Sequence, residues 1–116
     1  MLSDYIEFLR ECNGATFGSI ILFSWDELSE EEWRLWGMEE ETKNWICIGV
    51  TLSDEVIALN KYDGSVHLFH QGPPFQHLGV LGKDFNEFLG DYVFGIKYLD
   101  ISCGDKDDWY QILKNF

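Results

Sequence analysis

The chain has 116 residues, 46% of them hydrophobic and 16% aromatic, which suffices for one domain whose core needs neither disulfides nor a metal. Its 21 acidic and 8 basic side chains give a net charge of −13, which disfavours nucleic acid and favours a basic partner, although such a charge can also serve solubility alone. No window approaches the roughly 20 apolar residues that cross a bilayer, and the acidic N-terminus lacks a signal or transit pattern, so we expect a soluble cytoplasmic protein.

Three cysteines, Cys12, Cys47 and Cys103, lie far apart in apolar surroundings. An odd number of cysteines without a C-x-x-C spacing is typical of buried thiols rather than of disulfides or a zinc site. We therefore expect a reducing compartment, no bound metal and no cofactor.

The first predicted element is a helix over residues 4–12. Asp4 is expected to cap it, with Glu7 completing a capping box, and Asn13-Gly14 is expected to end it. Residues 19–25 then have the β-branched composition of a buried strand. The apolar face of the helix, read from i, i+3, i+4, i+7 spacing, consists of Tyr5, Phe8, Leu9 and Cys12.

Residues 24–42 combine acids with tryptophans. Two overlapping capping boxes, Ser24 with Glu27 and Ser29 with Glu32, predict one or two short helices. One interpretation is an amphipathic helix with a solvated acidic face; the other is an acidic rim around an aromatic anchor for a basic protein. The second interpretation assigns partner contact to Asp26, Glu27, Glu30, Glu31, Glu32, Trp33, Trp36, Glu39, Glu40 and Glu41.

Three strands are predicted next, over residues 44–52, 55–62 and 65–71, as an antiparallel meander. Asp63-Gly64 is the dipeptide favoured in a tight type I′ turn, and Gly72-Pro73-Pro74 ends the third strand. A helix with Asp84 and Glu87 as its capping box follows, then a last strand within residues 93–102. The closing helix is expected to bury Trp109, Ile112, Leu113 and Phe116.

Recognisable catalytic motifs are missing from the sequence, so we expect a protein that is not an enzyme. His67 and His70 lie three apart on a predicted strand and should point to opposite faces, while His77, in the predicted loop after the prolines, could approach either one. An ordinary half-buried role is favoured for these histidines over a joint site. Trp45 and Trp109 are expected to face the core.

The order of these motifs resembles the SUKH superfamily (the Smi/Knr-type domains). LSDYIEFLRECNG is similar to the family helix L-P-x-x-Y-x-x-F-L-x-x-x-N-G, with Ser3 at the usual proline. ILFSWDEL, WICIGV, VIALNKYDGSVHLFH and LGKDFNEFL are similar to the elements that follow it, although Ser53-Asp54 replaces the usual glycine-aspartate turn. The matching positions are Leu2, Tyr5, Phe8, Leu9, Asn13, Gly14, Phe85, Phe88 and Leu89.

This resemblance implies an α+β domain over residues 1–116, with helices flanking a mainly antiparallel sheet. It also implies a bacterial immunity protein that binds and neutralises a cognate toxin, a nuclease, without catalytic residues of its own; the alternative is a regulatory or scaffold domain of the type connected with cell-wall synthesis. Members usually have a further helix before this first one. We therefore expect apolar surface at Ile6, which a homodimer contact could cover.

Overall fold

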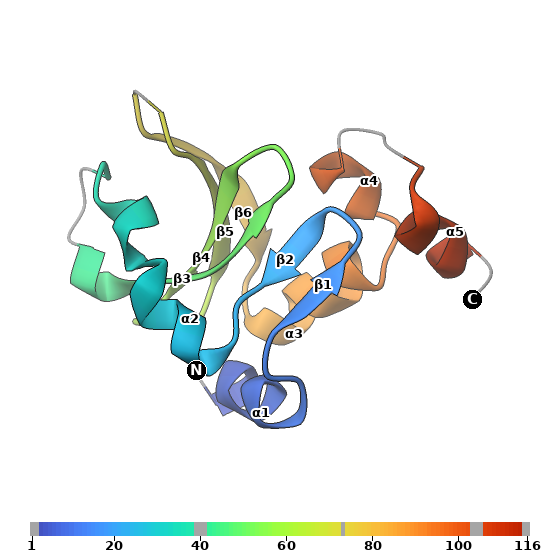
Figure 1. Ribbon diagram of the computed structural model, residues 1–116, viewed down its shortest axis with the longest axis horizontal. Helices are drawn as coiled ribbons and strands as arrows, with labels where there is room; N and C mark the ends of the chain where they lie inside the picture. The colour runs from blue at the N-terminus through green and yellow to red at the C-terminus, as the bar shows by residue number, and fades with distance from the viewer. Residues whose placement is uncertain (1–2, 39–41, 73, 103–105, 115–116) are drawn as a thin grey trace.

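Six antiparallel strands form a single sheet in the order of the chain (Figure 1). The computed structural model describes residues 3–38, 42–72, 74–102 and 106–114. Each strand pairs with its sequence neighbour, so the sheet is a meander throughout. The strands are β1 (Ala15–Phe17), β2 (Ile20–Leu22), β3 (Trp45–Thr51), β4 (Glu55–Asn60), β5 (Val66–His70) and β6 (Gln76–Gly82).

Helices lie on both faces of the sheet, and one face carries more helices than the other (Figure 1). The larger set comprises α1 (Ser3–Glu11), α3 (Phe85–Phe88), the π-helical turn η3 (Leu89–Val93), α4 (Tyr98–Ile101) and α5 (Asp108–Lys114). The smaller set, α2 (Trp25–Glu30) and the 3₁₀ turns η1 (Glu32–Leu35) and η2 (Thr42–Asn44), lies on the opposite side of the sheet from α3. The prediction of an α+β fold with helices flanking an antiparallel sheet is confirmed.

Two hydrophobic clusters lie on the two faces. The larger cluster buries Tyr5 and Leu9 of α1 against Phe85 and Phe88 of α3, with Tyr5 and Phe85 packed edge to face at 5.0 Å. The smaller cluster joins Leu35 of η1 to side chains of β3, β4 and β5. The predicted apolar face of α1 is therefore confirmed, and Gly14, at φ 88°, lies in the left-handed conformation expected beyond the helix end.

A buried tyrosine fixes the C-terminal part of the chain to the sheet. The hydroxyl of Tyr98 accepts a hydrogen bond from the backbone N–H of Ser19 at 2.7 Å and donates one to Asp107. Gly18 lies beside this hydroxyl, where any Cβ would collide with it. The contact therefore connects the β1–β2 turn, α4 and the start of α5 through one side chain.

Two strands, β1 and β6, were not predicted from the sequence. Residues 15–17 were expected to be a turn but form β1, and His77, expected in a loop, lies on β6. β1 has only three residues, and β6 contains two glycines and is offset from β5 by two bulges, so neither shows the alternation by which strands are recognised. Both strands are defined by pairing with a neighbour rather than by their own composition.

The turn between β4 and β5 also differs from the prediction. Asp63 does not adopt the positive φ that a type I′ turn needs; only Gly64 does, at 77°. The side-chain Oδ1 of Asn60 accepts the N–H groups of Tyr62 and Asp63, which widens the turn into a five-residue loop. Asp63 then accepts the backbone N–H and the hydroxyl of Ser65.

Residues 93–102 form no strand, contrary to prediction. The chain folds back so tightly that a Cβ at Gly95 would collide with the carbonyl oxygen of Gly90, and α4 follows, burying Tyr98 and Ile101. The i, i+3 spacing of these two residues is helical rather than strand-like. The prediction that this segment contributes apolar residues to the core is correct, but the strand periodicity assigned to it is wrong.

Smaller corrections concern helix ends and faces. α1 begins at Ser3, so Asp4 lies inside its first turn rather than before it, and Ser29 lies inside α2 and starts no second helix. In α5, Trp109 and Leu113 pack against the core, whereas Ile112 is 50% exposed. Leu2, Cys103 and Phe116 lie outside the described residues. Over the described residues, no helix combines the length and apolar character that crossing a membrane requires.

Candidate partner-binding surface

α2 projects from the smaller side of the sheet and begins at the predicted cap. The Ser24 hydroxyl accepts the N–H of Glu27, and the Glu27 carboxylate accepts the N–H of Ser24 at 2.8 Å, so the capping box is reciprocal and confirmed. Asn13 accepts the N–H of Trp25 at 2.7 Å and thereby ties the end of α1 to the start of α2. Trp25 itself projects outward and is 66% exposed.

η1 and the residue that caps its C-terminus carry two tryptophans, Trp33 within η1 and Trp36 directly after it, with buried Leu35 between them. Leu35 is 1% exposed and packs into the smaller cluster, whereas Trp33 and Trp36 are 45% and 74% exposed. A 3₁₀ turn has three residues, so side chains at i and i+3 are eclipsed, which places the two indoles along one outward stripe. Both tryptophans are therefore exposed, while Leu35 anchors the turn to the smaller cluster.

Arg34 secures this turn. Its Nε donates to Glu31 at 2.7 Å, its Nη1 donates to Gln71 at 3.3 Å, and its guanidinium lies 4.7 Å from the centre of the Trp33 ring. These contacts connect η1 to the loop after β5. Glu31, predicted to touch a partner, is half-buried and neutralised by Arg34, so it supports the surface from beneath.

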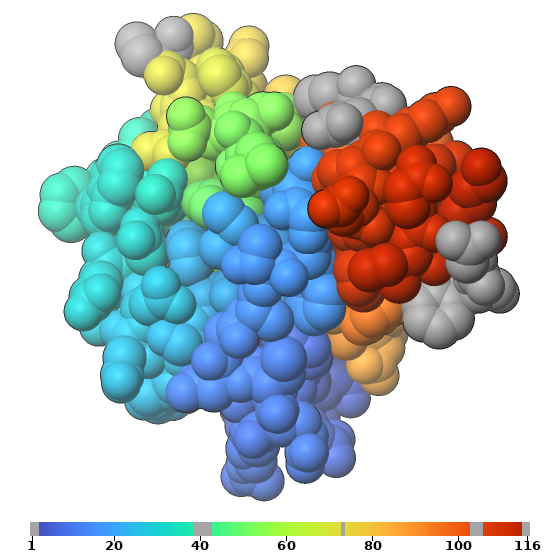
Figure 2. Space-filling view, turned by 45° about the vertical axis from the view of Figure 1, so that its right-hand side comes forward, coloured from blue at the N-terminus to red at the C-terminus, as the bar shows by residue number. Residues whose placement is uncertain are grey.

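We call the resulting feature the tryptophan–acid surface. Figure 2 shows the segment that carries it (cyan) and α5 (red) on opposite sides of the N-terminal segment (blue). The predicted contact residues that are exposed lie together along α2 and η1. Trp25, which was not among the predicted residues, is also exposed and belongs to the same surface. The sequence signal for Trp25 was Ser24, because this cap places Trp25 at the first position of α2. Glu39, Glu40 and Glu41 lie outside the described residues. The surface comprises Trp25, Asp26, Glu27, Glu30, Glu32, Trp33 and Trp36.

An apolar hollow of about 430 Å³ adjoins this surface, between α1 and α2. It is lined by Ile6, Leu9, Arg10, Asn13 and Trp25. Ile6 is 42% exposed, so the apolar surface expected there is present. Pairing of two copies through it stays a prediction.

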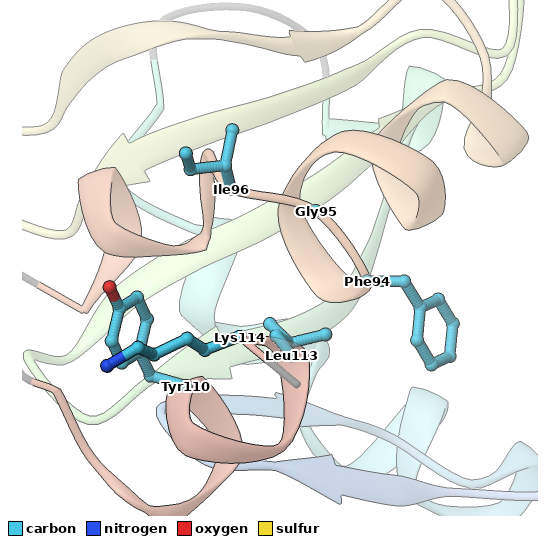
Figure 3. Close-up of a pocket in the computed structure, with 6 residues that line it drawn as sticks. All are labelled: Phe94, Gly95, Ile96, Tyr110, Leu113 and Lys114. Carbon is cyan, nitrogen blue, oxygen red and sulfur yellow. The ribbon is translucent and has the colours of Figure 1, made fainter. Parts of the chain in front are cut away.

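A second hollow, of about 270 Å³, lies on the C-terminal side of the molecule. Figure 3 shows Tyr110, Leu113 and Lys114 of α5 along one side of it, and Phe94, Gly95 and Ile96 of the turn before α4 along another. Ile96 is 86% exposed. No site is predicted here from the sequence, because residues 93–102 are predicted to form a strand.

The histidines are distributed over β5 and β6. His67 and His70 belong to opposite faces of β5, as predicted, because His67 pairs with Ala58 and His70 with Glu55. His77 lies against His67, with Nδ1 of His67 2.9 Å from Nε2 of His77. Trp45 lies beside this pair, buried as predicted, with its ring centre 4.8 Å from that of His67.

The buried ionisable groups are poor reactants. Burial raises the pKa of the Cys47 thiol to about 12, and burial also raises the pKa of the Tyr5 hydroxyl above its usual range. A thiol that stays protonated at neutral pH is a weak nucleophile. Within the described part of the chain, no three His, Cys, Asp or Glu side chains converge on a metal position.

A six-stranded antiparallel meander flanked by helices defines the chain as an α+β domain. It belongs to the SMI1/KNR4 family (SUKH-1), whose model matches residues 3–91, from α1 through the π-helical turn. This confirms the resemblance read from the sequence. No curated protein and no solved structure matches the chain. The tryptophan–acid surface falls inside the matched range, whereas α4 and α5 fall outside it.

Proposed function

We propose that this protein is an immunity protein that binds a cognate toxin, a nuclease, inside the producing cell and neutralises it by covering its active surface. The family to which the chain belongs includes immunity proteins. The observation that carries the proposal is the tryptophan–acid surface, where three exposed indoles stand among exposed carboxylates. Tryptophans are over-represented among the residues that contribute most binding energy at protein interfaces.

The charge of the chain supports a basic partner. A nuclease presents cationic side chains to phosphates, and a protein of net charge −13 attracts such a surface and accelerates its capture. Because the chain offers binding rather than catalytic groups on this flank, inhibition proceeds by occlusion. The partner loses access to its substrate while the two proteins remain associated.

The tryptophan–acid surface is too small to form the whole interface with a toxin. A stable interface buries about 1,600 Å² in total and uses about 20 to 30 residues from each partner. The seven residues of the tryptophan–acid surface therefore supply the centre and require neighbours. The adjoining hollow at Ile6 and Trp25 is the nearest apolar addition.

The cellular test begins with the neighbouring gene. The C-terminal domain of the protein that it encodes is expressed with and without this chain, and growth and complex formation by size exclusion are measured. Rescue of growth together with a 1:1 complex supports the proposal. Unchanged toxicity and separate elution refute it.

The surface is tested by charge reversal with a matched control. Glu30→Lys and Glu32→Lys lie on the tryptophan–acid surface, whereas Asp100→Lys makes the same change at an exposed position of α4, outside the family match. The first two variants should slow association with the toxin, and the effect should shrink from 0.1 M to 1 M salt as the Debye length falls from about 10 Å to about 3 Å. Equal slowing by Asp100→Lys would assign the effect to net charge instead of this surface.

A further inference from the structure

Two imidazoles meet on the part of the sheet that α2 and η1 leave uncovered. Nδ1 of His67, on β5, lies 2.9 Å from Nε2 of His77, on β6. His67 is half-buried against the rings of Trp45 and Phe69, which also contact each other, and His77 is exposed. Because β5 and β6 are hydrogen-bonded neighbours, both rings are carried by paired strands rather than by a loop, with a bulge of β6 next to His77.

The other ring nitrogen of His67, Nε2, is held by a chain of hydrogen bonds through Ser65 to Asp63. The Ser65 hydroxyl lies 2.7 Å from Nε2 of His67 and 2.6 Å from the carboxylate of Asp63. Hydrogen bonds from Ser65 hold the pKa of Asp63 below its usual range, so this carboxylate is ionised at neutral pH and only accepts.

This donor count assigns the tautomer of His67. The single hydroxyl hydrogen of Ser65 is donated to Asp63, so the Ser65 oxygen must receive the N–H of His67 Nε2. In the neutral ring, Nδ1 of His67 then carries a lone pair, and that lone pair faces His77. A ligating histidine typically has this arrangement, with its other N–H donated to an oxygen that a carboxylate supports.

We propose that His67 and His77 form a two-histidine site for a divalent transition-metal ion of the nickel or copper class, bound through Nδ1 of His67 and Nε2 of His77. Imidazole nitrogens bind divalent metal ions at about 2.0 to 2.1 Å, so two ring nitrogens 2.9 Å apart share one ion once both rings turn their lone pairs to the same side of the line that joins them. Imidazole suits Ni²⁺ and Cu²⁺, and Cu²⁺ binds most tightly in the general affinity order of the divalent first-row metals.

The surroundings suit an added cation. The stretch from Gln71 to Gly82 contains no Asp, Glu, Lys or Arg, so no lysine or arginine of β6 opposes the ion, and the net charge of −13 raises the local concentration of cations. With two protein ligands, water fills the remaining coordination positions. His77 releases its shared hydrogen bond and presents the Nε2 lone pair as the Nδ1–H tautomer.

The test is calorimetric titration of the full chain with Ni²⁺, in a non-chelating buffer at pH 7.5 with excess Mg²⁺ to occupy the surface carboxylates. We expect one Ni²⁺ per chain. His77→Gln, an exposed change on an edge strand, should weaken binding at least tenfold, and Ser65→Ala should weaken it about tenfold because the supporting hydrogen bond is lost. The matched control is His70→Gln, on the opposite face of β5, which should stay within twofold of the original affinity.

Three results would overturn the proposal: no Ni²⁺ binding in excess Mg²⁺, equal affinity in His77→Gln, or an equal loss in His70→Gln. Circular dichroism of each variant, recorded first, shows that the sheet is intact. Cu²⁺ provides a second readout, since its unpaired electron should broaden the ring resonances of His67 and His77 and leave those of His70 sharper. Neither readout depends on the toxin, so the site and the proposed function fail separately.

Discussion

The contrast between Leu35 and Trp36 gives the sharpest prediction about η1. Leu35 is 1% exposed in the smaller cluster, so Leu35→Ala removes a buried side chain and leaves a cavity, at a cost of about 2–5 kcal/mol in the free energy of unfolding. Trp36 is 74% exposed. The buried quarter of a tryptophan, about 60 Å² at about 25 cal/mol per Å², sets an upper limit of about 1.5 kcal/mol for Trp36→Ala.

Urea unfolding followed by far-UV circular dichroism measures both costs. In thermal unfolding, at roughly 4 °C per kcal/mol for a domain of this size, Leu35→Ala should lower Tm by about 8–20 °C and Trp36→Ala by at most about 6 °C. The order should reverse for toxin affinity, because Trp36→Ala deletes a contact residue and is expected to cost at least 2 kcal/mol, about thirtyfold in Kd. Ile112→Ala, a half-exposed apolar truncation on α5, is the matched control and should leave the Kd unchanged.

A Trp36→Ala protein that unfolds as readily as Leu35→Ala would refute the assignment of Leu35 as the buried member of η1. A Trp36→Ala protein that binds toxin with unchanged affinity would instead remove η1 from the interface. The two results are independent, because one reports the free energy of unfolding and the other the Kd at a temperature where both variants are folded.

Three further predictions concern buried and capped polar groups. Tyr98→Phe deprives the buried N–H of Ser19 of its acceptor and should lower the free energy of unfolding by about 1–3 kcal/mol in urea. Cys47, with a pKa of about 12, should resist iodoacetamide at pH 8 in the folded protein and react in urea. Mass spectrometry measures the number of alkylated cysteines in each state. Hydrogen bonds from Ser65 lower the pKa of Asp63 in the folded protein. The contribution of Asp63 to stability is therefore complete above about pH 4 and is lost as the pH falls through the folded pKa. Asp63→Asn should be less stable than the original chain at pH 7, and the difference in the free energy of unfolding should shrink towards pH 3.

Elements whose signals are local were predictable. α1 followed from helical spacing and from Asn13-Gly14, and the α2 start followed from Ser24 and Glu27, because caps and periodicity depend on neighbours within four residues. β3, β4 and β5 followed from buried apolar runs between turns. The family resemblance rested on these same segments, and the match over residues 3–91 confirmed it.

Elements defined by a distant partner were not predictable. β1 is a strand because β2 pairs with it, and β6 is a strand because β5 pairs with it across two bulges. The turn at Gly95 depends on the carbonyl oxygen of Gly90, which no local rule anticipates. The error on β6 also misplaced His77 in a loop, and with it the geometry of the histidine pair.

The sequence by itself determined the family and the acidic charge, and it indicated the segment that carries the tryptophan–acid surface, since these depend on residue types and short spacings. Only the tertiary structure decided which residues of that segment face outward. Leu35 is buried because side chains of β3, β4 and β5 pack against η1, and Arg34, which pairs locally with Glu31, also donates to Gln71 after β5. Contact between His67 and His77 likewise depends on strand register, a long-range property that places side chains ten residues apart within 2.9 Å.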